Sequence, residues 1–210
     1  MPRASERDKQ MRQRIALEAA RIIVEDGVKD YYQAKRKAAE HLNAPDSGNL
    51  PRNSEVEAAL VEYQRLFKST SHPGHLRTLR EAALQAMEFF EGFDPRLVGS
   101  VLRGTAGEHS DVNLHVFADT PEDVEFYLLN KGIPHESCEV RIKINGEPQR
   151  FSRYRFMAGD VPVDVVVFPA SGSRQAPLSP VDGKPMQRAT RKSVLAMLDD
   201  GEADALVTGT

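Results

Sequence analysis

Residues 97–117 read LVGSVLRGTAGEHSDVNLHVF, and here the hydrophobic period of the chain changes from helical to extended. Three apolar residues occur at every second position, Val112, Leu114 and Val116. The polar residues between and before them are Asp111, Asn113 and His115. Because side chains alternate between the two faces of a strand, the pattern predicts a half-buried strand whose polar residues share one face.

The chain before this stretch has the three-to-four-residue period of amphipathic helices. Helices are expected at about 15–23, 31–42, 54–67 and 75–90. Ser54 and Glu57 have the spacing of a capping box, which predicts the start of the third helix. We expect an N-terminal helical segment over residues 1–70, whose helices pack on each other as a small bundle or on the domain that follows.

The chain after this stretch alternates between strand and helix signals. A helix is expected from Thr120-Pro121 to Gly132, and Asn145-Gly146 predicts the turn of a β-hairpin. The nearly uniform apolar run 161–168 predicts a central strand. Residues 171–210 are expected to form a Pro/Gly-rich loop, a short helix over 190–199 and a loose tail.

Composition places the chain among ordinary globular proteins. It has 210 residues, 28% of them charged, and a formal net charge of −3. This charge makes no electrostatic case for DNA binding. Cys138 is the single cysteine, so no internal disulfide is possible. The charged N-terminus and the lack of a long apolar run predict a cytoplasmic protein without a membrane span.

Two features point to phosphate and metal chemistry. Gly99 and Ser100 are small enough for a phosphate to approach the backbone closely, and Ser100 adds a hydroxyl. Asp164 is the one charged residue of the apolar run, so its carboxylate needs a cation, a cluster of donors or a raised pKa. Hard oxygen ligands of this kind suit Mg²⁺, which also binds substrate phosphates.

Residues 76–169 resemble the minimal nucleotidyltransferases of the DNA polymerase beta superfamily. That family has Gly-Ser, about ten residues, Asp-x-Asp on a strand, and a third Asp on a later strand. Here Gly99-Ser100, Asp111-x-Asn113 and Asp164 occupy these places, and Arg103-Gly104 stands where the family often has Arg-Gly. The resemblance implies an α+β fold in which a nucleotidyltransferase-like domain over 71–170 has helices packed on a mixed sheet.

The resemblance also implies an activity, the transfer of a nucleoside monophosphate from a triphosphate such as ATP to a hydroxyl. The acceptor would belong to a small molecule, a protein or an RNA. Asp111, Asn113 and Asp164 would hold Mg²⁺, or Mn²⁺ as the alternative, with Asp111 and Asp164 as catalytic residues. The nucleotide would be bound by Gly99, Ser100 and Arg103.

Asn113 departs from the family pattern, since an amide replaces the second carboxylate. The alternative function is therefore a nucleotide-binding or regulatory module that has lost turnover. Two further alternatives concern single residues: His115 as an added nitrogen ligand, and Asp164 as a purely structural partner of an arginine. A third is that the polar residues at 111–115 are the solvated side of an edge strand.

Overall fold

A computed structural model describes residues 6–44, 48 and 50–208, with side chains up to residue 199. The chain forms two compact units. The helical unit contains residues 1–75, 107–110 and 180–183, and the sheet unit contains residues 76–106, 111–179 and 184–210. Two short segments from within the sheet half of the sequence therefore belong to the helical unit.

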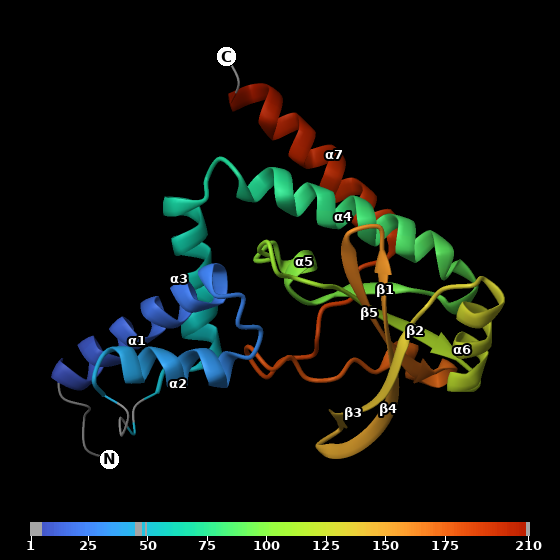
Figure 1. The fold of residues 1–210 in the computed structure, drawn as a ribbon, viewed down its shortest axis with the longest axis horizontal. Helices are drawn as coiled ribbons and strands as arrows, with labels where there is room; N and C mark the ends of the chain where they lie inside the picture. The colour runs from blue at the N-terminus through green and yellow to red at the C-terminus, as the bar shows by residue number, and fades with distance from the viewer. Residues whose placement is uncertain (1–5, 45–47, 49, 209–210) are drawn as a thin grey trace. The chain divides into compact units, whose positions relative to one another are not determined.

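The helical unit is built on three amphipathic helices that pack on one another (Figure 1). These are α1 (Glu6–Glu25), α2 (Tyr31–His41) and α3 (Asn53–Phe67). Their small core includes Ile15, Ile22, Ala34, Ala38 and Val56, all fully buried. The apolar faces of the helices thus pack against each other, which is one of the two arrangements expected from the sequence.

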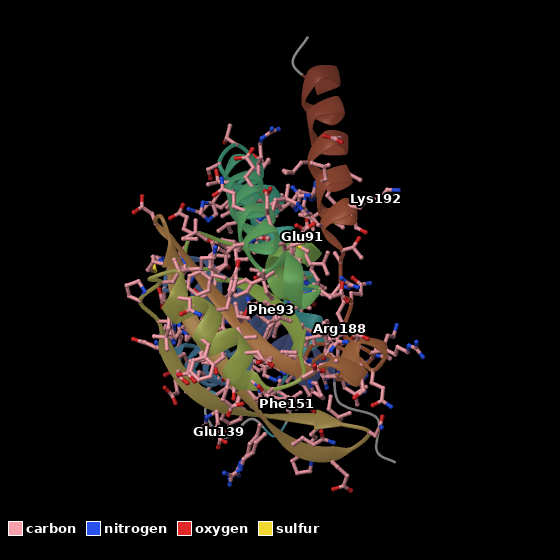
Figure 2. All side chains as sticks on the ribbon, turned by 90° about the vertical axis from the view of Figure 1, so that its right-hand side faces the viewer. Glu91, Phe93, Glu139, Phe151, Arg188 and Lys192 are labelled. Atoms are coloured by element: carbon pink, nitrogen blue, oxygen red, sulfur yellow. The ribbon has the colours of Figure 1, made fainter. Side chains whose placement is uncertain are left out.

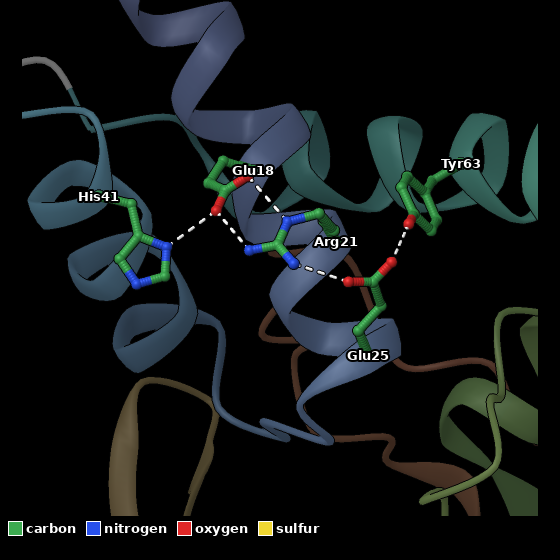
Figure 3. A network of polar contacts seen from close by, with 5 residues as sticks. All are labelled: Glu18, Arg21, Glu25, His41 and Tyr63. Atoms are coloured by element: carbon green, nitrogen blue, oxygen red, sulfur yellow. Dashed lines mark hydrogen bonds and ion pairs between the residues drawn. The ribbon is translucent and has the colours of Figure 1, made fainter.

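A chain of polar contacts joins the three helices (Figure 3). Glu18 and Arg21 of α1 form two hydrogen bonds of 2.8 and 3.0 Å, and His41 Nδ1 of α2 lies 2.9 Å from Glu18 Oε1. Arg21 also contacts Glu25 at 2.6 Å, and Glu25 accepts a hydrogen bond from the Tyr63 hydroxyl of α3. The network lowers the pKa of Glu18 to about 2, chiefly through Arg21.

The sheet unit is α+β, with a five-stranded mixed sheet in the order β1-β2-β5-β4-β3. Its strands are β1 (Arg96–Val98), β2 (Val112–Ala118), β3 (Glu136–Ile144), β4 (Glu147–Ala158) and β5 (Val161–Pro169). Only β2 and β5 run parallel, and the other neighbouring pairs are antiparallel. As the apolar run predicted, β5 is a central strand, between β2 and β4.

One face of the sheet carries the main core. Val112, Leu114 and Val116 of β2 are fully buried against apolar residues of the helices. The helices that contribute are α4 (His72–Phe89), α5 (Gly99–Arg103), α6 (Pro121–Asn130) and α7 (Arg191–Thr208). Because the apolar side of β2 is used here, its polar residues lie on the opposite face.

The opposite face divides into an apolar and a polar half. Its apolar half is a second cluster of Phe117, Ile144, Phe151 and Phe168. Figure 2 labels Phe151 on the sheet and Phe93 beside the end of α4. Phe93 belongs to the short 3₁₀ turn η1 (Glu91–Phe93) and packs on the main core. A second 3₁₀ turn, η2 (Ala170–Arg174), follows β5 directly.

Some elements differ from the expectations. The third helix begins at Asn53, and it is Glu55 that accepts the hydrogen bond from the Arg52 N–H, at 2.7 Å; Glu57 accepts one from the Tyr31 hydroxyl instead. β1 was not expected, since three residues are too few to show a period. In place of the expected loose tail, α7 extends to Thr208.

None of the described helices has both the length and the hydropathy that a membrane crossing requires.

Candidate functional site

The candidate site is a row of polar residues across the open face of the sheet. In the parallel pair β2–β5, Asn113 is the register partner of Asp164. In the antiparallel pair β5–β4, Asp164 is the register partner of Arg155. Asp111 precedes β2 by one residue, and both its carboxylate and that of Asp164 lie 3.7 Å from the Arg155 guanidinium. The structure thus brings Asp111, Asn113 and Asp164 to one face, although they come from two separate parts of the sequence.

β2 is not an edge strand, because β1 and β5 flank it. Asp111 and His115 are buried, with exposed fractions of 8% and 4%. The polar positions of this strand are therefore not its solvated side, and that alternative is wrong.

Gly99 lies directly against Asn113. Its φ angle is +78°, in the left-handed region that favours glycine. A Cβ atom at this position would lie 3.3 Å from Asn113 Nδ2, a tight contact that Asn113 could relieve only by shifting slightly. Asn113 Nδ2 also donates a hydrogen bond of 3.0 Å to the Asp111 carbonyl, so the Asn113 side-chain oxygen remains the group that can serve as a ligand.

Ser100 and Arg103 lie on α5, which follows β1. Ser100 is half-buried and its carbonyl accepts a hydrogen bond from the Thr105 N–H at 3.0 Å. Arg103 is exposed at the last residue of this helix. Their assignment to nucleotide binding stays a prediction.

Asp164 has an arginine as its counter-ion. Its side chain is only 3% exposed, and Arg153 Nε lies 2.8 Å from both of its carboxylate oxygens. Arg153 Nη2 makes a further contact with Oδ2. The carboxylate in turn raises the pKa of Arg153 above its usual range, mainly through these hydrogen bonds. Of the three possibilities that the sequence left open for Asp164, the structure shows a cation, Arg153 of β4.

His115 is unavailable as a metal ligand in this arrangement. Its Nδ1 accepts a hydrogen bond of 3.1 Å from Arg188 Nε, and its ring packs on Phe168 with 4.5 Å between the centroids. Burial lowers the pKa of His115 to about 3, and the nearby Arg188 charge adds to this shift. A neutral imidazole has one lone pair on nitrogen, and here Arg188 occupies it. The alternative of a nitrogen ligand at this position is therefore wrong.

The residues offer the type of ligand that the Mg²⁺ ion implied by the resemblance prefers, but they include two carboxylates where the family has three. Asp111, Asn113 and Asp164 all offer oxygen ligands, which Mg²⁺ prefers. Two carboxylates carry less charge than three, and both lie within 3.7 Å of an arginine. Across the described ranges, no group of three or more His, Cys, Asp or Glu residues is arranged to hold a metal ion. A divalent ion would have to compete with guanidinium groups for this site.

The two arginines of β4 are the residues that the sequence reasoning missed. The signal is present in the sequence, since the apolar residues Tyr154 and Phe156 stand at every second position and so share one face of the strand. The neighbours at the odd positions, Arg153 before Tyr154 and Arg155 between Tyr154 and Phe156, must therefore point to the other face. What the alternation did not show is which strand lies beside them.

Comparison with known proteins identifies no family for this chain: no family model matches it, and a search of curated proteins found no match.

Proposed function

We propose that this chain binds a nucleoside triphosphate on the open face of β2 and β5 and transfers its nucleoside monophosphate to a hydroxyl acceptor. One observation carries this proposal. The parallel register sets Asn113 beside Asp164, while Gly99 packs against Asn113. Gly-Ser, the Asp-x-Asn pair and the later Asp would have to meet in this way to act on one triphosphate.

The reaction can be written with these residues in named roles. The acceptor oxygen forms a bond to the α-phosphorus, the bond to the β-phosphate oxygen breaks, and pyrophosphate leaves. The hydroxyl proton passes to Asp111 or Asp164. A bound Mg²⁺, held by Asp111, Asn113 and Asp164, would neutralise phosphate charge. Gly99, Ser100 and Arg103 would hold the phosphates.

A second candidate is a nucleotide-binding module without turnover. Two observations favour it: Asn113 brings no charge, and Arg153 and Arg155 already offset the charges of Asp111 and Asp164. In such a module the nucleotide would act as a signal and would be released unchanged.

The substitution Asn113→Asp tests the proposal, because it restores the third carboxylate with little change in shape. It also removes the hydrogen bond to the Asp111 carbonyl, at a cost in stability of about 1 kcal/mol. We expect stronger binding of Mg²⁺ and faster nucleotidyl transfer. Asp111→Asn should abolish transfer. Asn130→Asp is the matched control, since it adds the same charge on an exposed residue at the end of α6.

The measurement is transfer of labelled nucleotide from each triphosphate, with Mg²⁺ or Mn²⁺, to the protein itself or to a cell extract. Background transfer by the wild type, Asn113→Asp and Asp111→Asn, together with measurable binding of a triphosphate, would favour the module without turnover. If the folded protein bound no triphosphate under any of these conditions, both candidates would be wrong.

A further inference from the structure

Arg155 lies between the two carboxylates of the candidate site but is held tightly by neither. Its Nη2 lies 3.7 Å from Asp111 Oδ2, and its Nε lies 3.7 Å from Asp164 Oδ2. Both distances exceed those of a hydrogen bond. Its side chain is 42% exposed.

Arg153, two residues earlier on the same face, is different. It makes hydrogen bonds of 2.8 Å to both oxygens of Asp164 and is 31% exposed. Arg153 therefore satisfies the buried carboxylate. Arg155 adds a second positive charge, and the structure shows it no hydrogen-bond acceptor among the described residues.

A guanidinium group has five N–H donors in a planar arrangement that matches two oxygens of a phosphate. Charge-assisted pairs of this kind are about twice as strong as neutral hydrogen bonds. A triphosphate that reached this face would therefore offer Arg155 better partners than two carboxylate oxygens at 3.7 Å. A turn toward phosphate would break no hydrogen bond of Arg155 to these carboxylates, whereas Arg153 would lose its bonds to Asp164.

We propose that Arg155 binds the phosphates of the triphosphate directly and supplies positive charge that the resemblance assigns to metal ions. This inference rests on the proposed function, since it concerns the same site. Asn113 and Arg155 change the site in the same direction: the amide removes one negative charge that would attract a cation, and the guanidinium adds a fixed positive one. The site therefore depends less on divalent ions for phosphate binding than one with three carboxylates.

Isothermal titration calorimetry with ATP and with inorganic tripolyphosphate, each in EDTA and in Mg²⁺, tests this role. Tripolyphosphate has neither base nor sugar, so its affinity reports the contacts to phosphate alone. We expect the wild type to bind both compounds in EDTA, and Arg155→Gln to weaken both about tenfold or more. Arg141→Gln on β3 is the matched control. Arg141 is exposed, and the alternation of β3 places it on the opposite face from Glu136, the register partner of Arg155.

A second readout separates this role from simple neutralisation of the carboxylates. Mg²⁺ binding without nucleotide should become tighter in Arg155→Gln, because a competing cation is lost. If Mg²⁺ binding rose while the affinities for ATP and tripolyphosphate stayed at the wild-type level, Arg155 would only neutralise Asp111 and Asp164, and the inference would be overturned. If the wild type bound ATP in neither EDTA nor Mg²⁺, it is the proposed function itself that would fail.

Arg155→Lys provides a second test if Arg155→Gln does not fold. Lysine retains the charge but cannot make a planar pair of hydrogen bonds to phosphate. We expect tripolyphosphate binding to weaken several-fold in this variant. An affinity equal to that of the wild type would contradict a direct phosphate contact by the guanidinium.

Discussion

Asp164 is a charged side chain inside an apolar strand, and the energetic question is how its charge is tolerated. A carboxylate that is 3% exposed loses most of its hydration. Arg153 compensates this loss with hydrogen bonds to both oxygens. A buried pair adds little stability compared with apolar residues, but removal of one partner leaves an uncompensated charge.

We therefore expect Arg153→Gln to lower the free energy of unfolding by about 3 kcal/mol. Arg150→Gln on the same strand is the control. Arg150 pairs with Glu139 at 3.1 Å, but both side chains are 64% exposed, so its loss should cost less than about 1 kcal/mol. Urea denaturation at pH 7 measures both changes. Equal effects of the two substitutions would contradict the role given to Arg153.

At the scale of elements, α1, α2 and α3 combine a small core with a polar network. Many of the buried residues of this core are alanines, which contribute little apolar area each. Glu18 connects two of the helices, since it contacts Arg21 of α1 and His41 of α2. The contacts between these helices should therefore depend on the ionisation of Glu18.

The pKa of Glu18, about 2 in the folded protein, lies below its ordinary value of 4.5. The folded state thus binds fewer protons than the unfolded state between these values, and the contribution of Glu18 to stability is present above pH 4.5 and lost as the pH falls through about 2. We expect Glu18→Gln to lower the melting temperature at pH 7 and to make its decrease between pH 4.5 and 2 less steep.

Glu62→Gln on α3 provides the comparison for Glu18→Gln. Glu62 pairs with Arg65 at 2.6 Å, but the two side chains are 48% and 68% exposed. Circular dichroism of the full chain during heating, repeated across this pH range, follows both variants. The same pH dependence in Glu18→Gln and the wild type would show that the network does not stabilise the helices.

At the scale of the whole molecule, the two compact units have separate cores. Ile22 is fully buried in the core of the helical unit, and Leu128 is fully buried in the core of the sheet unit. Replacement of such a residue by alanine costs about 2–5 kcal/mol, because it leaves a cavity. This loss should act mainly on the unit that contains the residue.

We expect Ile22→Ala to increase amide hydrogen exchange in α1, α2 and α3 more than in β2 and β5. Leu128→Ala, as the reciprocal variant, should increase exchange in the sheet more than in these helices. Hydrogen exchange measured by mass spectrometry resolves both sets of peptides. A uniform increase throughout the chain in either variant would indicate a single cooperative unit.

Much of the architecture could be predicted from sequence, because local periods and turn residues depend on nearby residues alone. The alternation at 112–116 predicted β2 and its buried face, and Asn145-Gly146 predicted the hairpin, in which both residues have positive φ angles. The apolar run predicted that β5 is central. These features follow from backbone geometry and from which side chains avoid water.

Only the tertiary structure decided which residues meet. The sequence left a cation, a cluster of donors or a raised pKa open for Asp164, and the order of the strands placed Arg153 of β4 beside it. The sequence left His115 as a possible metal ligand. In the structure, its Nδ1 accepts a hydrogen bond from Arg188, which lies 73 residues later in the chain. Residues 107–110 and 180–183 belong to the helical unit, although no local hydrophobic period predicts this. Periodicity places a side chain on a face, whereas its partner depends on strand order and on contacts between distant parts of the chain.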